Sequence, residues 1–325
     1  MRCQDFGQPY KPKNLDFAFK ISSIMPSPNS AISQFLQATR PRTYPIAIAS
    51  LAVSQSLAYR SLGGFGMTNW VLAFLMIYTA LSLQILSNLA NDYGDGVRGT
   101  DSLRHADSPA RLVGSGAVSF GRFRAWLLVW LVQTMAVGSV LIWLSPLTFG
   151  QVVLFFGLGA VSILGALGYT MGRRPYGYHA LGEVAVLIFF GYVAVLGGYY
   201  LQVGRVDIAQ NFIIATGVGL LSACVMYINN LRDVKTDKLS GKMTLAVVLG
   251  RYRIAGYLGL LSVAVLCYFV HFYRSGGVGA WQMVGLLPLF WHIYQVVRDR
   301  SDPVRLGKQL KTIMALVVMF NWLAI

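Results

Sequence analysis

The stretch that decides the fold runs from 211 to 237 and reads NFIIATGVGLLSACVMYINNLRDVKTD. Its first part, 211–231, carries no charged side chain. An apolar helix of roughly 20 residues is long enough to cross the hydrocarbon core of a bilayer. Polar residues then crowd the end of the stretch, namely Asn229, Asn230, Arg232, Asp233 and Asp237. We therefore expect a transmembrane helix that delivers a polar site to the membrane surface.

The composition extends this prediction to the whole chain. Of 325 residues, 55% are hydrophobic and 12% are charged, and the mean hydropathy is +0.56. A soluble domain carries about 25% charged residues. We predict an all-α, polytopic membrane protein, because helices satisfy their own backbone hydrogen bonds in lipid. Nine predicted transmembrane segments follow at 44–60, 70–91, 123–144, 150–169, 180–200, 211–231, 254–272, 279–296 and 310–325.

The basic residues predict the orientation of these segments. If the connections alternate between two sides, all but three of the 27 Lys and Arg residues fall on one side, the exceptions being Arg60, Arg205 and Arg274. The positive-inside rule places the richer side, with the N-terminus and the acidic regions, in the cytoplasm, which predicts a multi-pass membrane protein with its site on the cytoplasmic side. The net charge of +15 could also indicate nucleic-acid binding. Positions at the ends of spans favour anionic lipid headgroups and an anionic substrate instead.

The N-terminal region has a different composition from the rest. Residues 1–28 mix Pro, Lys, Asn and Ser and contain no apolar core of signal-peptide length, which predicts a disordered cytoplasmic tail. A translation start at Met25 is an open alternative. An amphipathic helix at 29–39 is expected to lead into the first span, and residues 29–325 to form a single domain. Cys3, Cys224 and Cys267 have no spacing typical of a disulfide or metal site.

The acidic residues are unevenly placed. The chain has 12 acids, of which Glu183 is the only Glu. Half of the acids lie in two predicted cytoplasmic regions: Asp92, Asp95, Asp101, Asp107, Asp233 and Asp237.

Two motifs stand out within those regions. The first, NLANDYGD at 88–95, spaces Asn88, Asp92 and Asp95 on one helical face as far as Gly94 permits a helix. In the second, Asn229, Asp233 and Asp237 share a face in the same way. One such motif would be ordinary at a helix end, but two on the same side of a membrane indicate function.

Two carboxylate faces at one membrane depth repel each other unless cations lie between them. Oxygen-only ligands of this kind suit Mg²⁺, which usually shares its coordination shell with water and phosphate. Arg98 and Lys242 follow the two motifs and could neutralise a diphosphate. The sequence thus predicts Mg²⁺ ions, held by Asp92, Asp95, Asp233 and Asp237, that bind a diphosphate.

At these residues the chain resembles the UbiA superfamily of intramembrane aromatic prenyltransferases. The matching stretches are Arg40 to Pro45, Asn88 to Asp95, Tyr169-Thr170, Arg174 to Gly177, Leu181 to Glu183, Ile228 to Asp233 and Gly241 to Leu245. Within the superfamily, the Asn-Asn-Leu-Arg-Asp form of the second motif is most similar to the branch (MenA type) that prenylates 1,4-dihydroxy-2-naphthoate. The resemblance implies nine spans with the acidic motifs on the second and sixth.

The resemblance also implies a reaction. Mg²⁺-assisted ionisation of a polyprenyl diphosphate would be followed by attack on the naphthoate ring and loss of CO₂, giving demethylmenaquinol in menaquinone biosynthesis. Tyr169 would face the allylic cation, or else belong to an interfacial aromatic belt. The expected catalytic residues are Asp92, Asp95, Asp233, Asp237, Tyr169, Arg98 and Lys242, and the expected substrate-binding residues are Asn88, Asn91, Asn229, Asn230, Arg173, Arg174 and Glu183.

Two alternatives remain open at this point. Another UbiA-type acceptor, such as 4-hydroxybenzoate, would use the same two motifs. An ion-coupled transporter would also need acids in a membrane, but transporter sites lie near the bilayer midplane, whereas these acids lie at its predicted edge.

Overall fold

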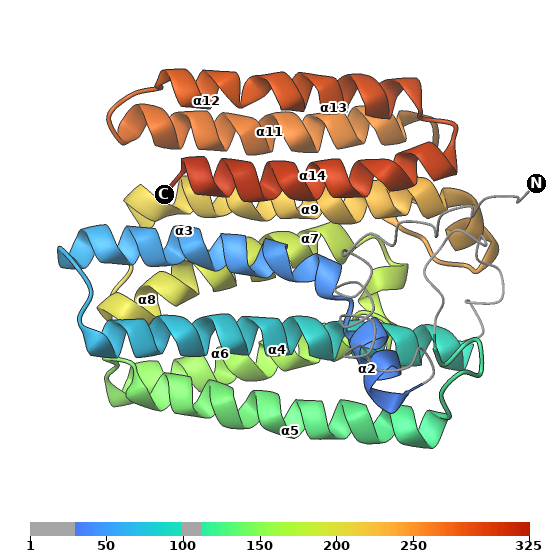
Figure 1. Ribbon diagram of the computed structural model, residues 1–325, viewed down its shortest axis with the longest axis horizontal. Helices are drawn as coiled ribbons and strands as arrows, with labels where there is room; N and C mark the ends of the chain where they lie inside the picture. Colours follow the sequence, from blue (N-terminus) through green and yellow to red (C-terminus); the bar gives the residue numbers. More distant parts are fainter. Residues whose placement is uncertain (1–29, 99–111) are drawn as a thin grey trace, which may run out of the picture.

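The computed structural model describes residues 30–98 and 112–325, and Figure 1 shows their helices running along one common direction. Among these residues there is no β-strand, and an isolated bridge joins His179 to Met243. The prediction of an all-α protein is therefore confirmed. The first elements in the chain are α2 (Ala31–Thr39), η1 (Pro41–Thr43), α3 (Tyr44–Leu62), α4 (Met67–Arg98), α5 (Phe120–Leu144) and α6 (Phe149–Gly168).

The second part of the chain begins with a broken helix. A short α7 (Gly182–Val186) passes into the π-helical η4 (Leu187–Gly197) and then into α8 (Gly198–Val203). The 3₁₀ turn η3 (Tyr176–Tyr178) precedes it. The elements that follow it are α9 (Ile208–Leu239), α10 (Leu245–Leu249), η5 (Gly250–Tyr252), α11 (Arg253–Arg274), α12 (Ala280–Val284), α13 (Leu286–Arg298) and α14 (Pro303–Leu323).

Each of the nine predicted segments coincides with helix in the described chain, and the amphipathic helix expected at 29–39 is α2. Six helical stretches are long and apolar enough to cross a membrane, and they correspond to the second to seventh predicted spans. The full count of nine crossings stays a prediction. The tail at 1–28 lies outside the described residues.

Two helices run beyond their predicted spans. α4 and α9 each contain 32 residues. At 1.5 Å per residue that is about 48 Å, against about 30 Å of hydrocarbon. α4 continues through Gly94, where we expected the helix to weaken. Gly94 allows α4 to pack closely against Thr170, since a Cβ at position 94 would lie 2.8 Å from the Thr170 carbonyl oxygen.

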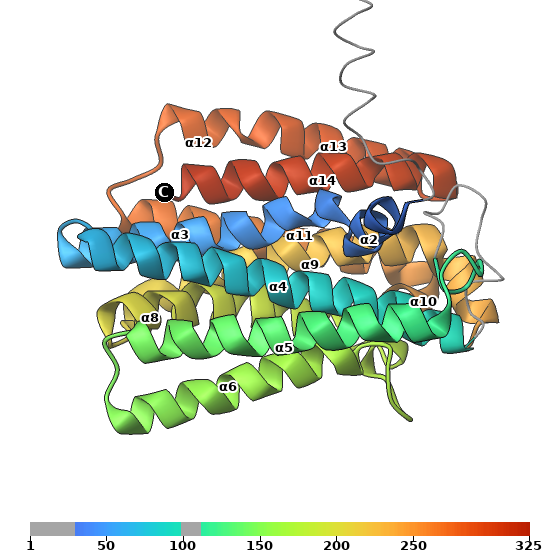
Figure 2. The same ribbon diagram turned by 60° about the horizontal axis from the view of Figure 1, so that its bottom comes forward.

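α9 lies at the centre of the bundle (Figure 2). Ile214, Ala215, Val218 and Leu221 are fully buried in a core shared with α3, η4, α11 and α14. A smaller core joins α2, α4, α5 and α6. The two helices that carry the acidic motifs therefore belong to different cores.

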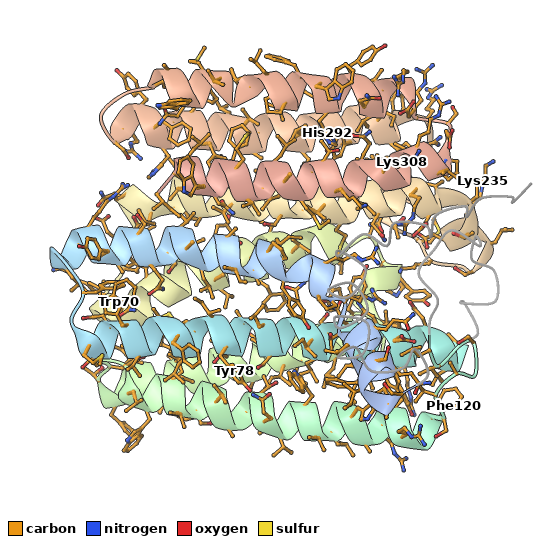
Figure 3. The ribbon with its side chains drawn as sticks, in the orientation of Figure 1. Trp70, Tyr78, Phe120, Lys235, His292 and Lys308 are labelled. Carbon is orange, nitrogen blue, oxygen red and sulfur yellow. The ribbon has the colours of Figure 1, made fainter. Side chains whose placement is uncertain are left out.

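Both acidic helix ends lie at the same end of the bundle, where α2 and α10 also lie (Figures 1 and 2). In Figure 3 the labelled Lys235 and Lys308 mark this end, and Trp70 lies toward the opposite one. The even number of chain reversals between the ends of α4 and α9 thus places two motifs that are more than 130 residues apart in sequence at the same end of the bundle, as expected.

Candidate active site

The first acidic motif is fixed by segments that follow or precede it in the chain. Asn88 donates from Nδ2 to the carbonyl oxygen of Thr39 at 2.9 Å, which ties α4 to the end of α2. Asp92 is 2% exposed and accepts backbone N–H groups from Leu112 (3.3 Å) and Val113 (3.4 Å). Its charge is thus held by main-chain donors of the loop before α5.

The rest of this motif grips the loop between α6 and α7. The Tyr178 hydroxyl donates to Oδ1 of the buried Asp95 at 3.2 Å. Asn91 accepts from the hydroxyl of Thr170 at 3.2 Å. Arg98 donates to the carbonyl oxygens of Thr170 and of residue 172, so the end of α4 and this loop form one unit.

The second motif is held by a neighbour on its own helix. Arg232 forks onto Asp233, with Nε–Oδ1 at 2.7 Å and Nη2–Oδ2 at 2.5 Å, and also donates to Asn229 at 2.7 Å. Asp237, 7% exposed, accepts the Lys242 backbone N–H at its carbonyl oxygen, at 2.8 Å. This turn brings the Lys242 side chain back over the site.

Glu183 lies directly beside this motif. Asn230 donates from Nδ2 to Glu183 Oε1 at 2.8 Å, and both residues are buried. Oε2 of Glu183 is buried and accepts no hydrogen bond from the described chain. An acid so placed has one oxygen available for a substrate donor, because leaving it unpaired in the interior is costly.

Two tyrosines form the meeting point of both motifs. The Lys242 Nζ lies 5.5 Å from the Tyr169 ring centroid and 5.7 Å from that of Tyr178, while Arg98 Cζ lies 5.2 Å from the Tyr178 ring. A cation within about 6 Å of a ring face is stabilised by it. The cations from the ends of α4 and α9 thus share one aromatic platform.

Burial raises the pKa of the Tyr169 phenol, and the carboxylates of Glu183, Asp95 and Asp237 raise it further, while Arg40 opposes them. Carboxylates from α4, α7 and α9 therefore act on a single ring. The phenol stays neutral at physiological pH, because its ordinary pKa of about 10 is already well above 7. Tyr169 is 9% exposed and does not lie in an outward-facing belt.

The two loops that carry these tyrosines and Lys242 are joined to each other. The Met243 N–H donates to the Tyr178 carbonyl oxygen at 3.2 Å, in the bridge between His179 and Met243. Gly177 permits this fold, since a Cβ there would lie 2.6 Å from the Tyr169 carbonyl oxygen. The two loops thus hold the platform from both sides.

The structure does not gather every residue that the sequence singled out. Arg173 and Arg174 are exposed and make no hydrogen bond or ion pair with the described part of the chain. Asp101 and Asp107 lie outside the described residues. Tyr178 and Arg232 were missed. Tyr178 directly follows the quoted Arg174 to Gly177 stretch, and Arg232 sits inside the second motif, so adjacency was the available signal.

The donor set fits a hard cation. Asp92, Asp95, Asp233 and Asp237 are all buried and offer only oxygen atoms. Among residues 30–98 and 112–325, no three His, Cys, Asp or Glu side chains are gathered as a complete metal site. Mg²⁺ does not need such a cage, because substrate phosphate and water usually complete its octahedron.

Comparison with known proteins agrees with this geometry. The UbiA prenyltransferase family matches the chain over residues 48–323. The chain belongs to this family. The sequence resemblance is thus confirmed, as is the prediction of an enzyme. The transporter alternative is set aside because the family is one of prenyltransferases.

Curated UbiA-family relatives cover most of the chain. A 1,4-dihydroxy-2-naphthoate octaprenyltransferase of Haemophilus influenzae is 40% identical over 74% of this chain and 77% of its own length. The protein of that name from Escherichia coli K12 is 34% identical over 90% of this chain and 94% of its own. A UbiA homologue from Archaeoglobus fulgidus, solved bound to GPP and Mg²⁺, shares the fold at 14% identity, with a TM-score of 0.57 over 90% of this chain and 99% of that one.

Proposed function

We propose that this UbiA-family enzyme transfers a polyprenyl chain from its diphosphate to 1,4-dihydroxy-2-naphthoate, with loss of CO₂, giving demethylmenaquinol for menaquinone biosynthesis. The observation that carries the proposal is the Tyr169–Tyr178 platform, where Arg98 and Lys242 lie over the rings, the Tyr178 hydroxyl donates to Asp95 of α4, and the Lys242 N–H donates to Asp237 of α9. Relatives named for naphthoate prenylation at 34–40% identity support the acceptor.

The diphosphate would lie between the two helix ends. Asp92, Asp95, Asp233 and Asp237 would hold Mg²⁺, which supplies Lewis-acid stabilisation of the leaving diphosphate when bound. Arg98 and Lys242 would bind non-bridging oxygens of the diphosphate, and their contacts with the Tyr178 ring hold them in position before the substrate binds. On binding, Asp233 would exchange part of its ion pair with Arg232 for contact with the incoming Mg²⁺–diphosphate complex.

The acceptor would bind on the α7 side of the platform. The Glu183 Oε2 can accept a hydrogen bond from a ring hydroxyl, and Asn230 holds the other oxygen in register. Tyr169 presents a neutral, buried ring to the allylic carbon, which favours positive charge there and excludes water. Arg173 and Arg174, at the rim, would attract the acceptor carboxylate before it enters.

The orientation follows from the charge of the two ends. Lys235, Lys308 and their basic neighbours lie at the acidic-motif end (Figure 3), and Arg60, Arg205 and Arg274 belong to helix ends on the other side. We infer that the site faces the cytoplasm in a bacterial inner membrane. Residues 29–325 would form one domain, preceded by a tail.

A labelled acceptor tests the proposal. Purified enzyme receives carboxyl-labelled naphthoate and a polyprenyl diphosphate, and label is followed in gas and in product. We expect one CO₂ released for each prenylated product, because attack occurs at the carboxylate-bearing carbon. Label retained in the product would refute the naphthoate assignment. Faster turnover of 4-hydroxybenzoate, which keeps its carboxyl group, would identify the other acceptor class.

A further inference from the structure

A polar cavity lies at the end of the bundle opposite the acidic motifs. It has a volume of about 680 Å³ and is formed where the ends of α3, α8 and α11 meet the start of α9 (Figure 1). This volume is in the range of pockets that hold small ligands. Its polar lining includes Arg60, Ser61, Arg205, Asp207, Asn211 and His271.

The cavity is lined by basic residues although basic residues are scarce on its side of the membrane. Only Arg60, Arg205 and Arg274 among the 27 basic residues were assigned to this side. Arg60 and Arg205 line the same cavity, and Arg274 donates to the carbonyl oxygen of Ala209 in the first turn of α9 beside it. Arginines are disfavoured on this side, so their concentration at one place calls for an anionic ligand.

Asn211 is an independent indication of a ligand. It lines the cavity in the first turn of α9, is 2% exposed, and its Nδ2 donates to nothing in the described chain. An amide donor buried without a partner is costly, and a ligand oxygen would remove that cost. The start of α9 adds the partial positive charge of a long helix.

The acid of the cavity and some of its other polar groups are already engaged. Asp207 caps α9 by accepting the Gln210 N–H at 3.1 Å. Tyr199 donates to Ser61 at 2.9 Å, and Arg60 donates through Nη2 to the main-chain oxygen of Ile325, the last residue of the sequence. Arg205 is exposed at the rim, and its described contacts include no acid.

We propose that this cavity binds the phosphate group of an anionic membrane lipid. Phosphate suits paired arginines, an amide donor and a helix N-terminus. A lipid is the source to which the geometry points, because the cavity lies at the ends of membrane-spanning helices, where lipid headgroups lie, and also has apolar walls from Leu57, Val206 and Ile208, where the acyl stem could lie. The site is separate from prenyl transfer, since no residue of the Tyr169–Tyr178 platform lines it.

Native mass spectrometry of the full chain in detergent tests this proposal. Wild-type protein, Arg60→Gln/Arg205→Gln and the control Arg122→Gln/Arg124→Gln are each titrated with phosphatidylglycerol and with phosphatidylcholine. The control removes the same charge from exposed positions on α5, at the acidic-motif end. We expect the cavity variant alone to bind phosphatidylglycerol at least about fivefold more weakly. Equal binding by all three proteins would overturn the proposal.

A second variant and a second ligand complete the test. Asn211→Asp keeps the side-chain size and adds a negative charge, so it should also weaken phosphatidylglycerol binding, with thermal melting in lipid-free detergent checking the fold. Unchanged binding by a folded Asn211→Asp protein would contradict the site. Stabilisation of the wild type by inorganic phosphate, with none by phosphatidylglycerol, would overturn the lipid as the source.

Discussion

The ends of α4 and α9 present similar acids but secure them in opposite ways. Asp92 and Asp95 depend on groups that other segments supply, namely the N–H groups of Leu112 and Val113 and the hydroxyl of Tyr178. Asp233 is instead paired with Arg232, the residue before it. Asp92 and Asp95 are therefore secured by tertiary contacts, and Asp233 by its neighbour on the same helix. Damage to the loops should reach Asp92 and Asp95 and spare the Asp233–Arg232 pair.

The largest effect should come from removing the metal, because in the proposed function both helix ends bind the diphosphate through it. We expect exhaustive EDTA treatment to abolish prenyl transfer, and Mg²⁺ or Mn²⁺ to restore it. Ca²⁺ should restore it poorly, since it prefers a larger and looser shell. The assay is product formation by mass. Full activity in EDTA would contradict a metal held between the two ends.

Loss of one carboxylate at each end comes next. Asp92→Ala and Asp233→Ala should each lower kcat/KM by at least about a hundredfold, since in the proposed function both carboxylates hold the same metal ions and act as a unit. The two variants should differ in stability, because Asp92→Ala also frees the loop at Leu112 and Val113. Melting temperatures in detergent measure that difference. More than a tenth of wild-type activity in either variant would refute the shared site.

Tyr178→Phe separates the two ends more finely. The change removes the donor to Asp95 but leaves the ring beneath Arg98 and Lys242. We expect kcat/KM to fall by about tenfold, the cost of one hydrogen bond to a charged group. The matched control is Tyr176→Phe, whose hydroxyl donates to the Gly165 carbonyl oxygen away from the acids. Equal losses in both variants would remove the special role of Tyr178.

The smallest effect tests packing alone. Gly94→Ala forces a Cβ against Thr170, with the nearest atoms at 2.7 Å and 2.8 Å, and should destabilise the protein by about 1–3 kcal/mol. Gly159→Ala, in the middle of α6 with nothing within 4 Å, should be neutral or stabilising by about 1 kcal/mol. Thermal melting in detergent compares them. A neutral Gly94→Ala would mean that α4 can move away from the α6–α7 loop.

The sequence predicted the parts of the molecule that repeat along a helix. Apolar length located the helices, and the spacing of Asn229, Asp233 and Asp237 already implied that α9 continues past 231 as a helix. The predicted span edge was set by hydropathy, which falls where the polar turns begin. The helix itself does not end there, because its last two turns are held by Arg232 and by the return of the chain to Lys242.

Contacts made by the backbone could not be predicted in this way. The partners of Asp92 are N–H groups, which every residue but proline carries, so Leu112 and Val113 leave no trace in composition. The exposure of Arg173 and Arg174 could not be predicted either, since their position depends on how the loop turns between Tyr169 and Tyr178. Tyr178 could have been included, because it continues a stretch that was already of interest.

The length of α9 has a consequence for kinetics. At about 48 Å, α9 carries its acids past the hydrocarbon, while its core stays within it. On the proposed function, one substrate would then arrive from three-dimensional solution and the other by two-dimensional diffusion in the leaflet. For the polyprenyl diphosphate, the apparent KM expressed as a mole fraction in the lipid should stay constant as the vesicles are diluted. For the aromatic acid, the apparent KM should stay constant when it is expressed as a molar concentration in the surrounding water.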